Sequence, residues 1–214
     1  MNYSRLDLLA LAIAVAAVAV WSAWAPHDWI TWFLEAAPVL IAVPLLLATY
    51  RVFPFTPLAY TLMALHAVVL LIGAHYTYAE VPWFNNLRDT FDLERNHYDR
   101  LGHLAQGFFP AIMAREILLR RSPLKTGKWL FFVVTCFCLA FSAFYEMIEW
   151  WVALLADDGA VTFLGTQGDP WDTQWDMFLA LCGALSAQTL LGRWHDRALR
   201  RLSPRPASRR ARRN

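Results

Sequence analysis

Residues 129–155 read WLFFVVTCFCLAFSAFYEMIEWWVALL, and this stretch decides the fold class. It exceeds the roughly 20 residues that an α-helix needs to cross the hydrocarbon core of a bilayer. Its formally charged residues are Glu146 and Glu149, both near its end. The alternation of apolar and polar residues that marks a membrane β-strand is missing. The stretch therefore predicts a transmembrane helix that carries two carboxylates.

The rest of the chain has the same character. Of its 214 residues, 58% are hydrophobic and 17% are charged, and 11 are tryptophan. A soluble domain of this size needs far more polar surface, so the composition excludes that class. Five further apolar runs of about membrane-spanning length lie at Leu6–Trp24, Ile30–Tyr50, Pro57–Tyr78, Asp99–Leu119 and Asp172–Trp194. We expect an all-α polytopic membrane protein with six transmembrane helices, which form one domain at residues 1–194.

The topology follows from the charged residues and from the first run, which has no convincing small-x-small cleavage site and should stay uncleaved. With six spans, sixteen of the 19 basic residues fall on one side, and Arg88, Arg95 and Arg100 fall on the other. Because basic residues stay in the cytoplasm, we expect both termini there. Residues 195–214 should form a disordered basic tail against anionic lipid. No nucleic-acid partner is expected, since no aromatic residue follows Trp194 to stack on a base.

Three pairs of ionisable residues lie inside these otherwise apolar runs. They are Asp99 and His103, Glu146 and Glu149, and Asp172 and Asp176. Each pair is spaced i,i+3 or i,i+4, so its two side chains share one helix face. An ionisable group at membrane depth costs on the order of 2.5–3.5 kcal/mol or more, and is a functional-site hypothesis by default. By the expected topology all three pairs lie at similar depth below the outer surface, so we expect the last three helices to bring them together.

The chemistry of this group favours a divalent metal. Five carboxylates surround one imidazole, and the nearby cations are Arg95 and Arg100, so the acids need a bound cation or shared protons. Mixed ligation of this kind suits Mg²⁺, Mn²⁺, Zn²⁺ or Fe²⁺ without selecting one. The candidate metal ligands are Asp99, His103, Glu146, Glu149 and Asp176. The same residues and Asp172 are the candidate catalytic groups, although Asp172 could instead cap the helix that it begins.

Other residues of the fourth run support such a site. Gln106 lies on the helix stripe of Asp99 and His103, and we take it as a candidate substrate-binding residue. Arg100 is the second, as a contact for phosphate. Gly102 and Gly107 should permit a neighbouring helix to approach closely.

The same segments carry a family resemblance. Residues 96–111, 145–150 and 165–177 resemble the YjdF family, a bacterial inner-membrane family of unknown function, and the third stretch is the most specific. The resemblance covers most of the chain and implies a multi-pass protein of the bacterial inner (plasma) membrane. The layout is also distantly similar to the VanZ-like superfamily, in which an Asp-x-x-x-His helix precedes a Glu-bearing and an Asp-bearing helix. Both resemblances imply the same site residues, and neither supplies a reaction.

The leading hypothesis is an outward-facing site that uses a divalent metal on a lipid-linked or cell-envelope substrate. The reaction would be hydrolysis or transfer at a phosphate or ester, where a metal polarises an oxygen or activates water. One alternative is a small ion-coupled transporter or proton relay built from the same carboxylates. It needs a route to the cytoplasm, and the inner halves of the last three helices offer little polarity beyond Arg115 and Glu116. A second alternative is a non-catalytic protein in which the polar cluster only specifies packing.

Overall fold

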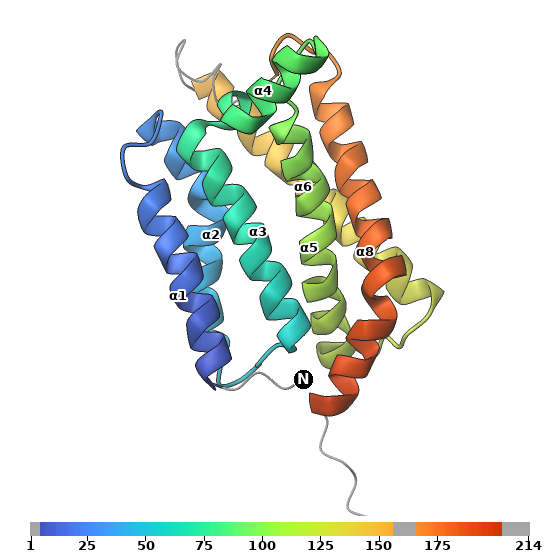
Figure 1. The fold of residues 1–214 in the computed structure, drawn as a ribbon. Coiled ribbons are helices and arrows are strands. Elements are labelled where there is room, and N and C mark those ends of the chain that lie inside the picture. Colours follow the sequence, from blue (N-terminus) through green and yellow to red (C-terminus); the bar gives the residue numbers. More distant parts are fainter. Residues whose placement is uncertain (1–4, 156–165, 203–214) are drawn as a thin grey trace, which may run out of the picture.

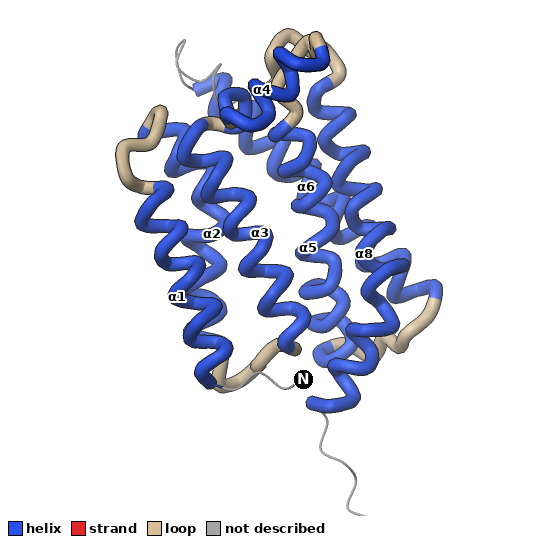
Figure 2. The backbone as a smooth tube through the Cα atoms, viewed as in Figure 1, coloured by secondary structure: helices blue, strands red, loops and turns tan. Residues whose placement is uncertain are grey.

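A computed structural model describes residues 5–155 and 166–202 of the chain, and these residues are all-helical, with no strand among them. Six long helices lie side by side, and one short helix, α4, lies across one end of the bundle (Figures 1 and 2). The helices are α1 (Arg5–Ser22), α2 (Trp29–Thr49), α3 (Pro57–Tyr76), α4 (Pro82–Phe91), α5 (Tyr98–Arg121), α6 (Lys128–Leu155) and α8 (Asp172–Leu202), with a 3₁₀ turn η1 (Tyr78–Glu80).

Each of the six predicted apolar runs coincides with one long helix. Among the described residues, α2, α3 and α6 are long and apolar enough to cross a membrane. The apolar part of α1 is shorter, and α5 and α8 carry the polar residues of the site. The all-helical class is therefore confirmed, whereas the number of six spans stays a prediction.

Successive long helices run in opposite directions, so α1 begins and α8 ends at the same end of the bundle (Figure 1). The opposite end carries α4 and η1, within a segment that the sequence suggested only as a long loop. Pro82 stands in the first turn of α4, where its missing N–H does no harm. Asp92 ends this helix in the left-handed conformation and returns its N–H to the Arg88 carbonyl.

Helix α8 continues beyond the expected sixth span. It runs to Leu202, so residues 195–202, which we expected in the tail, are helical, and His195 among them is fully buried. The remainder of the expected tail, residues 203–214, lies outside the described residues.

Two glycines allow α5 and α8 to touch through their backbones. A Cβ atom added at Gly107 of α5 would lie 1.9 Å from the Ala180 carbonyl oxygen. One added at Gly183 of α8 would lie 2.2 Å from the Leu104 carbonyl oxygen. The close approach predicted at Gly107 is therefore confirmed. A Cβ atom added at Gly102 would instead lie 2.7 Å from the aromatic ring of Tyr78.

Candidate functional site

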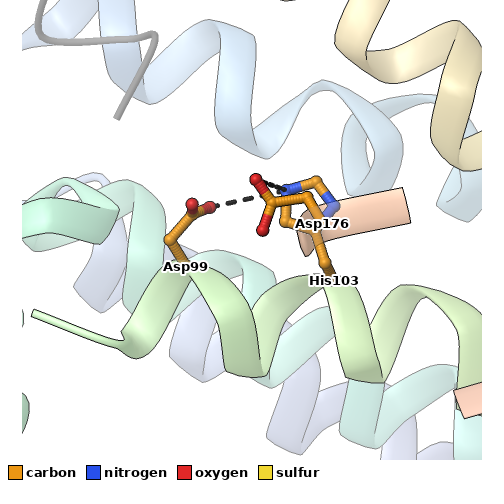
Figure 3. Close-up of side chains that lie close together, drawn as sticks. All are labelled: Asp99, His103 and Asp176. Atoms are coloured by element: carbon orange, nitrogen blue, oxygen red, sulfur yellow. Dashed lines mark ion pairs between the residues drawn. The ribbon is translucent and has the colours of Figure 1, made fainter. Parts of the chain in front are cut away.

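His103 is the centre of a buried polar cluster. Its Nε2 atom lies 3.5 Å from an Asp99 oxygen, 3.6 Å from a Glu146 oxygen and 3.9 Å from an Asp176 oxygen. These carboxylates come from α5, α6 and α8 respectively, and Figure 3 shows His103 with Asp99 and Asp176. The structure thus brings together one member of each sequence pair, or two in the case of α5.

Gln106, one turn further along α5, fixes the imidazole. Its Oε1 atom lies 3.1 Å from His103 Nδ1. An amide oxygen can only accept, so Nδ1 donates to Gln106, and Nε2 is the ring nitrogen that faces the carboxylates. Histidines that bind metals are held in this way, by a hydrogen bond from the nitrogen that does not face the ion. Gln106 therefore contacts His103 and serves to orient it.

Two overlapping groups of side chains have the spacing of metal ligands. Potential ligand atoms of Asp99, His103 and Asp176 lie within 4.8 Å of one another, and so do those of His103, Glu146 and Glu149. Glu146 Oε1 and Asp176 Oδ1 are buried and have no hydrogen-bond partner among the described residues. We call Asp99, His103, Glu146, Glu149 and Asp176 the outer cluster, after the side of the membrane on which we expect them. Glu146 Oε1 is also the oxygen that lies 3.6 Å from His103 Nε2, so a cation bound beside that nitrogen would supply the missing partner of a buried oxygen.

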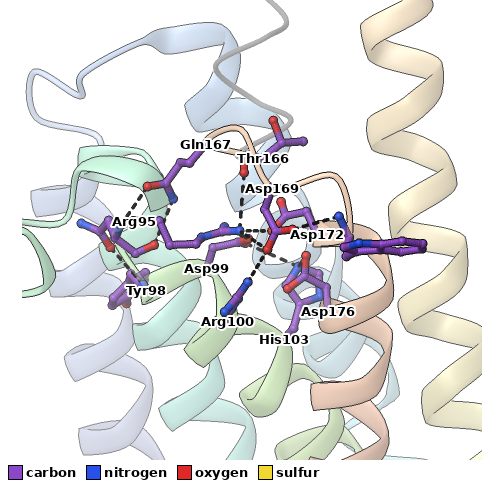
Figure 4. Close-up of polar contacts among 12 residues, drawn as sticks. Arg95, Tyr98, Asp99, Arg100, His103, Thr166, Gln167, Asp169, Asp172 and Asp176 are labelled. Carbon is purple, nitrogen blue, oxygen red and sulfur yellow. Dashed lines mark hydrogen bonds and ion pairs between the residues drawn. The ribbon is translucent and has the colours of Figure 1, made fainter. Parts of the chain in front are cut away.

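Asp172, the sixth predicted residue, lies in a separate charged layer nearer to α4 (Figure 4). Its carboxylate is paired with Arg95, which also lies 3.4 Å from Asp99. Asp169 is 2.6 Å from Arg100 and accepts a hydrogen bond from the Trp171 N–H. Asp169 therefore stabilises the turn that precedes α8, whereas Asp172 binds a cation of the neighbouring segment.

Arg100, the predicted phosphate contact, is already paired in this layer. Its guanidinium binds Asp169 and lies 5.3 Å from the centre of the Trp175 ring. Because Asp169 already binds this guanidinium, a phosphate at the outer cluster would have to draw Arg100 from Asp169.

Sequence reasoning missed the hydrogen bonds that join the loops above the site. The Asn96 N–H donates to Gln167 Oε1 at 2.8 Å, and Gln167 Nε2 donates to the Asn96 carbonyl at 2.9 Å. The Asn96 amide also donates to the Val81 carbonyl and to Asn85. These bonds fix α5 and α8 at the ends that carry Asp99 and Asp176 (Figure 4). Asn96 and Gln167 both lie in family-resembling stretches, which was the available signal.

A cavity of about 40 Å³ adjoins the outer cluster. Its walls include Asp99, His103, Gln106 and Glu149. Glu35 of α2 and His66 of α3 also line it. Glu35 is 4% exposed, and its Oε2 atom and His66 Nε2 have no hydrogen-bond partner among the described residues. Neither residue was among the predicted site residues, because neither has a second ionisable residue at i+3 or i+4 to form a pair.

A second buried polar group, which we call the inner cluster, lies toward the opposite end of the bundle. Its members are Thr56, Arg115, Glu116, Arg120, His195 and Asp196. The carboxylate of Glu116 is fully buried and accepts hydrogen bonds from Thr56, Arg120 and His195. Because every contact is a matched donor and acceptor, this group fastens the inner ends of α3, α5 and α8.

Comparison with known proteins agrees with this description. Residues 8–197 match the family model described as "Predicted membrane protein (DUF2238)". The chain is 50% identical over 190 residues to the inner membrane protein YjdF of Escherichia coli (strain K12), covering 89% of this chain and 91% of the relative. No solved structure matches. The distant likeness to the VanZ-like superfamily stays a prediction. The protein is an integral protein of the bacterial inner membrane, and the chain belongs to the DUF2238 family of predicted membrane proteins.

Proposed function

We propose that the outer cluster binds one divalent metal ion and that the protein uses it on a lipid-linked or cell-envelope substrate. The observation that carries the proposal is His103 Nε2, which faces three carboxylates within 3.9 Å while Gln106 holds Nδ1. Metal–ligand bonds are about 2.0–2.2 Å long, so small rotations of these side chains suffice to close on an ion.

The charge balance supports a cation rather than hydrogen bonding alone. Asp99, Glu146, Glu149 and Asp176 place four carboxylates around one imidazole. Arg95 is engaged by Asp172 as well as Asp99, so little positive charge is left for the cluster. Like charges in a low-dielectric interior repel strongly, and a divalent ion relieves that repulsion.

The reaction that suits this site is hydrolysis or transfer at a phosphate or ester. A bound divalent ion would polarise a substrate oxygen and lower the pKa of a coordinated water. A carboxylate of the cluster that is not needed as a ligand can take the proton from that water. Arg100 would contact a phosphate only after leaving Asp169.

A transporter or proton relay is less well supported. Between Gln106 and Arg115, the buried residues of α5 are Gly107, Ala111, Ile112 and Ala114. They carry no ionisable group, and the nine residue steps from Gln106 to Arg115 span about 13 Å of helix. The outer and inner clusters are thus separated by apolar packing along α5.

Metal binding is tested by thermal unfolding of the purified protein in detergent with Mg²⁺, Mn²⁺, Zn²⁺ or a chelator. A ligand at 100 times its Kd stabilises the folded state by about 2.7 kcal/mol. At least one metal should raise the Tm of the wild type, and His103→Ala and Glu149→Gln should abolish that gain. The exposed control Glu94→Gln should keep it. The same metal response in wild type and both site variants would leave a structural polar cluster as the better explanation.

A further inference from the structure

Glu35 is a buried carboxylate that metal binding at the outer cluster does not use. It lies in the second turn of α2, about 9 Å along the helix from Trp29, and is 4% exposed. One of its oxygens is within hydrogen-bonding reach of the Tyr78 backbone N–H. The other, Oε2, is buried without a hydrogen-bond partner among the described residues, although it borders the cavity. A carboxylate at membrane depth without a partner is costly, so a ligand that donates to Oε2 would relieve that cost.

The cavity favours a cationic donor. Its described wall residues include the carboxylates of Glu35, Asp99 and Glu149 and no lysine or arginine. A divalent ion at the outer cluster, facing four carboxylates, would still leave negative charge before Glu35 is counted. The rings of Tyr78, Phe141 and Tyr145 also line the cavity. Aromatic faces attract cations, most strongly where water is excluded.

The cavity also reaches the side of the bundle between α2 and α6. Phe141 of α6 borders the cavity and is 41% exposed, and Pro38 of α2 borders it from the other side. One turn nearer to α4, the Tyr145 hydroxyl donates to the Leu34 carbonyl at 3.1 Å and closes the gap between these helices. In a helix bundle that spans a membrane, this side opening faces lipid.

The size of the cavity limits what can enter. The cavity of about 40 Å³ holds roughly three water-sized groups. An ammonium group with one or two carbons fits this space, whereas a sugar ring does not. His66 Nε2, also without a hydrogen-bond partner among the described residues, borders the same space and can contact a second polar atom of the ligand.

We infer that this cavity binds the primary ammonium group of an amine-bearing lipid headgroup, with Glu35 Oε2 as the acceptor. The inference rests on the proposed function in that it names the substrate class that would lie beside the metal. The ammonium group donates a hydrogen bond to Glu35 and lies against the faces of the aromatic rings. The rest of the lipid leaves the cavity between α2 and α6, past Phe141.

The first test compares ethanolamine with ethylene glycol, which has the same size and no charge, by thermal unfolding in detergent. Ethanolamine should stabilise the wild type saturably, and ethylene glycol should not. Charge-assisted hydrogen bonds are about twice as strong as neutral ones, so Glu35→Gln should weaken the apparent affinity about tenfold or more. Glu94→Gln should not change it. Equal stabilisation by both compounds, or an unchanged affinity in Glu35→Gln, overturns the inference.

A second variant guards against a Glu35→Gln protein that does not fold. Phe141→Ala lies at the exposed rim, where loss of a large lipid-facing ring leaves the core intact. A cation–π contact contributes about 0.5–1 kcal/mol at such sites, so ethanolamine affinity should fall roughly two- to fivefold. Unchanged affinity in Phe141→Ala would also count against an ammonium group in this cavity.

The source of the amine is tested in lipid nanodiscs. Phosphatidylethanolamine added to phosphatidylglycerol should raise the Tm of the wild type and leave that of Glu35→Gln unchanged. Stabilisation by free ethanolamine without any effect of phosphatidylethanolamine refutes a lipid ligand. Metal titration separates the two proposals, because Glu35→Gln should keep its metal response. If His103→Ala loses the metal response and amine stabilises none of the proteins, the metal-site proposal stands and the headgroup proposal is overturned.

Discussion

His195 Nε2 lies 3.0 Å from a Glu116 oxygen, although the two residues are 79 positions apart and both are fully buried. On the other side of the ring, Arg115 Nη1 lies 2.8 Å from His195 Nδ1. Arginine can only donate, so Nδ1 accepts, and Nε2–H donates to Glu116. The imidazole therefore joins two neighbouring residues of α5 to α8 as a neutral link with one fixed tautomer.

Replacing His195 by Ala should destabilise the protein strongly. The change leaves a buried acceptor on Glu116 and a buried donor on Arg115 unpaired, at about 1–3 kcal/mol for each group. For a chain of this length about 1 kcal/mol corresponds to roughly 2–4 °C in Tm. Thermal unfolding in detergent should show a loss of several degrees. Arg197→Ala, two residues away on an exposed side of α8, should change the Tm little, and a Tm of His195→Ala equal to that of this control would contradict the argument.

The difference between the two clusters explains what the sequence could reveal. Asp99 and His103 stand out because they form a pair in an apolar run, as do Glu146 and Glu149, at one expected depth. Such pairs predict a shared site without any knowledge of packing. Which carboxylate meets which cation depends on loop structure, so the pairing of Asp172 with Arg95 could not be predicted.

The inner cluster and Glu35 gave no comparable signal. His195 precedes a run of many arginines, and its segment resembled a solvated tail. Besides His195, Glu116 has one more partner in another segment among the described residues, Thr56, which caps α3 and has no charge. Glu35 is a single acid in α2, and the Tyr78 backbone N–H that faces it lies much further along the chain. The boundaries of the first five long helices, in contrast, followed closely from hydropathy, because membrane-spanning length limits them, whereas α8 continues past its predicted end.

Asp28 should make the stability of α2 depend on pH. The Thr31 backbone N–H donates a 2.6 Å hydrogen bond to this N-cap carboxylate and holds its pKa below the usual value. Because the pKa is lowered in the folded state, the ionised carboxylate stabilises the protein fully above the unfolded pKa, which is about 4. This stabilisation is lost as the pH falls through the folded pKa. Asp28→Ala should lose about 1 kcal/mol at neutral pH.

The Tm difference between wild type and Asp28→Ala should shrink between about pH 5 and pH 3 as the carboxylate is protonated. Asp28→Asn is the matched control, because asparagine caps a helix nearly as well without a titrating group. It should resemble the wild type near neutral pH and show no such change. A constant difference between wild type and Asp28→Ala at all pH values would mean that the cap hydrogen bond contributes little.

The orientation of the bundle can be tested at its two ends. Asn86 lies on α4 and Lys125 between α5 and α6, both exposed and at opposite ends of the bundle (Figure 1). In a background without Cys136, Cys138 and Cys182, Asn86→Cys should react with an impermeant maleimide in intact cells. Lys125→Cys should react only after permeabilisation, because the basic residues favour a cytoplasmic position for its loop. The reverse pattern would place the outer cluster toward the cytoplasm.

Gly107→Ala should separate α5 from α8 and disturb the outer cluster. The new methyl group would meet the Ala180 carbonyl at 1.9 Å, and backbone atoms cannot move aside as a side chain can. Gly107 is one turn from His103, and Ala180 is one turn from Asp176, so the shift enlarges the 3.9 Å separation of His103 and Asp176. Overpacking of this kind costs about 1–3 kcal/mol or more. Both the Tm and its increase with metal should therefore fall.

Gly192→Ala is the matched control for this change. Like Gly107, Gly192 is a buried helical glycine, and it lies in α8. A Cβ atom added there would meet nothing within 4 Å. Alanine in a helix is more favourable than glycine by up to about 1 kcal/mol, so this variant should be slightly more stable than the wild type and keep its metal response. If Gly107→Ala and Gly192→Ala change the Tm in the same direction, backbone contact between α5 and α8 does not set the geometry of the site.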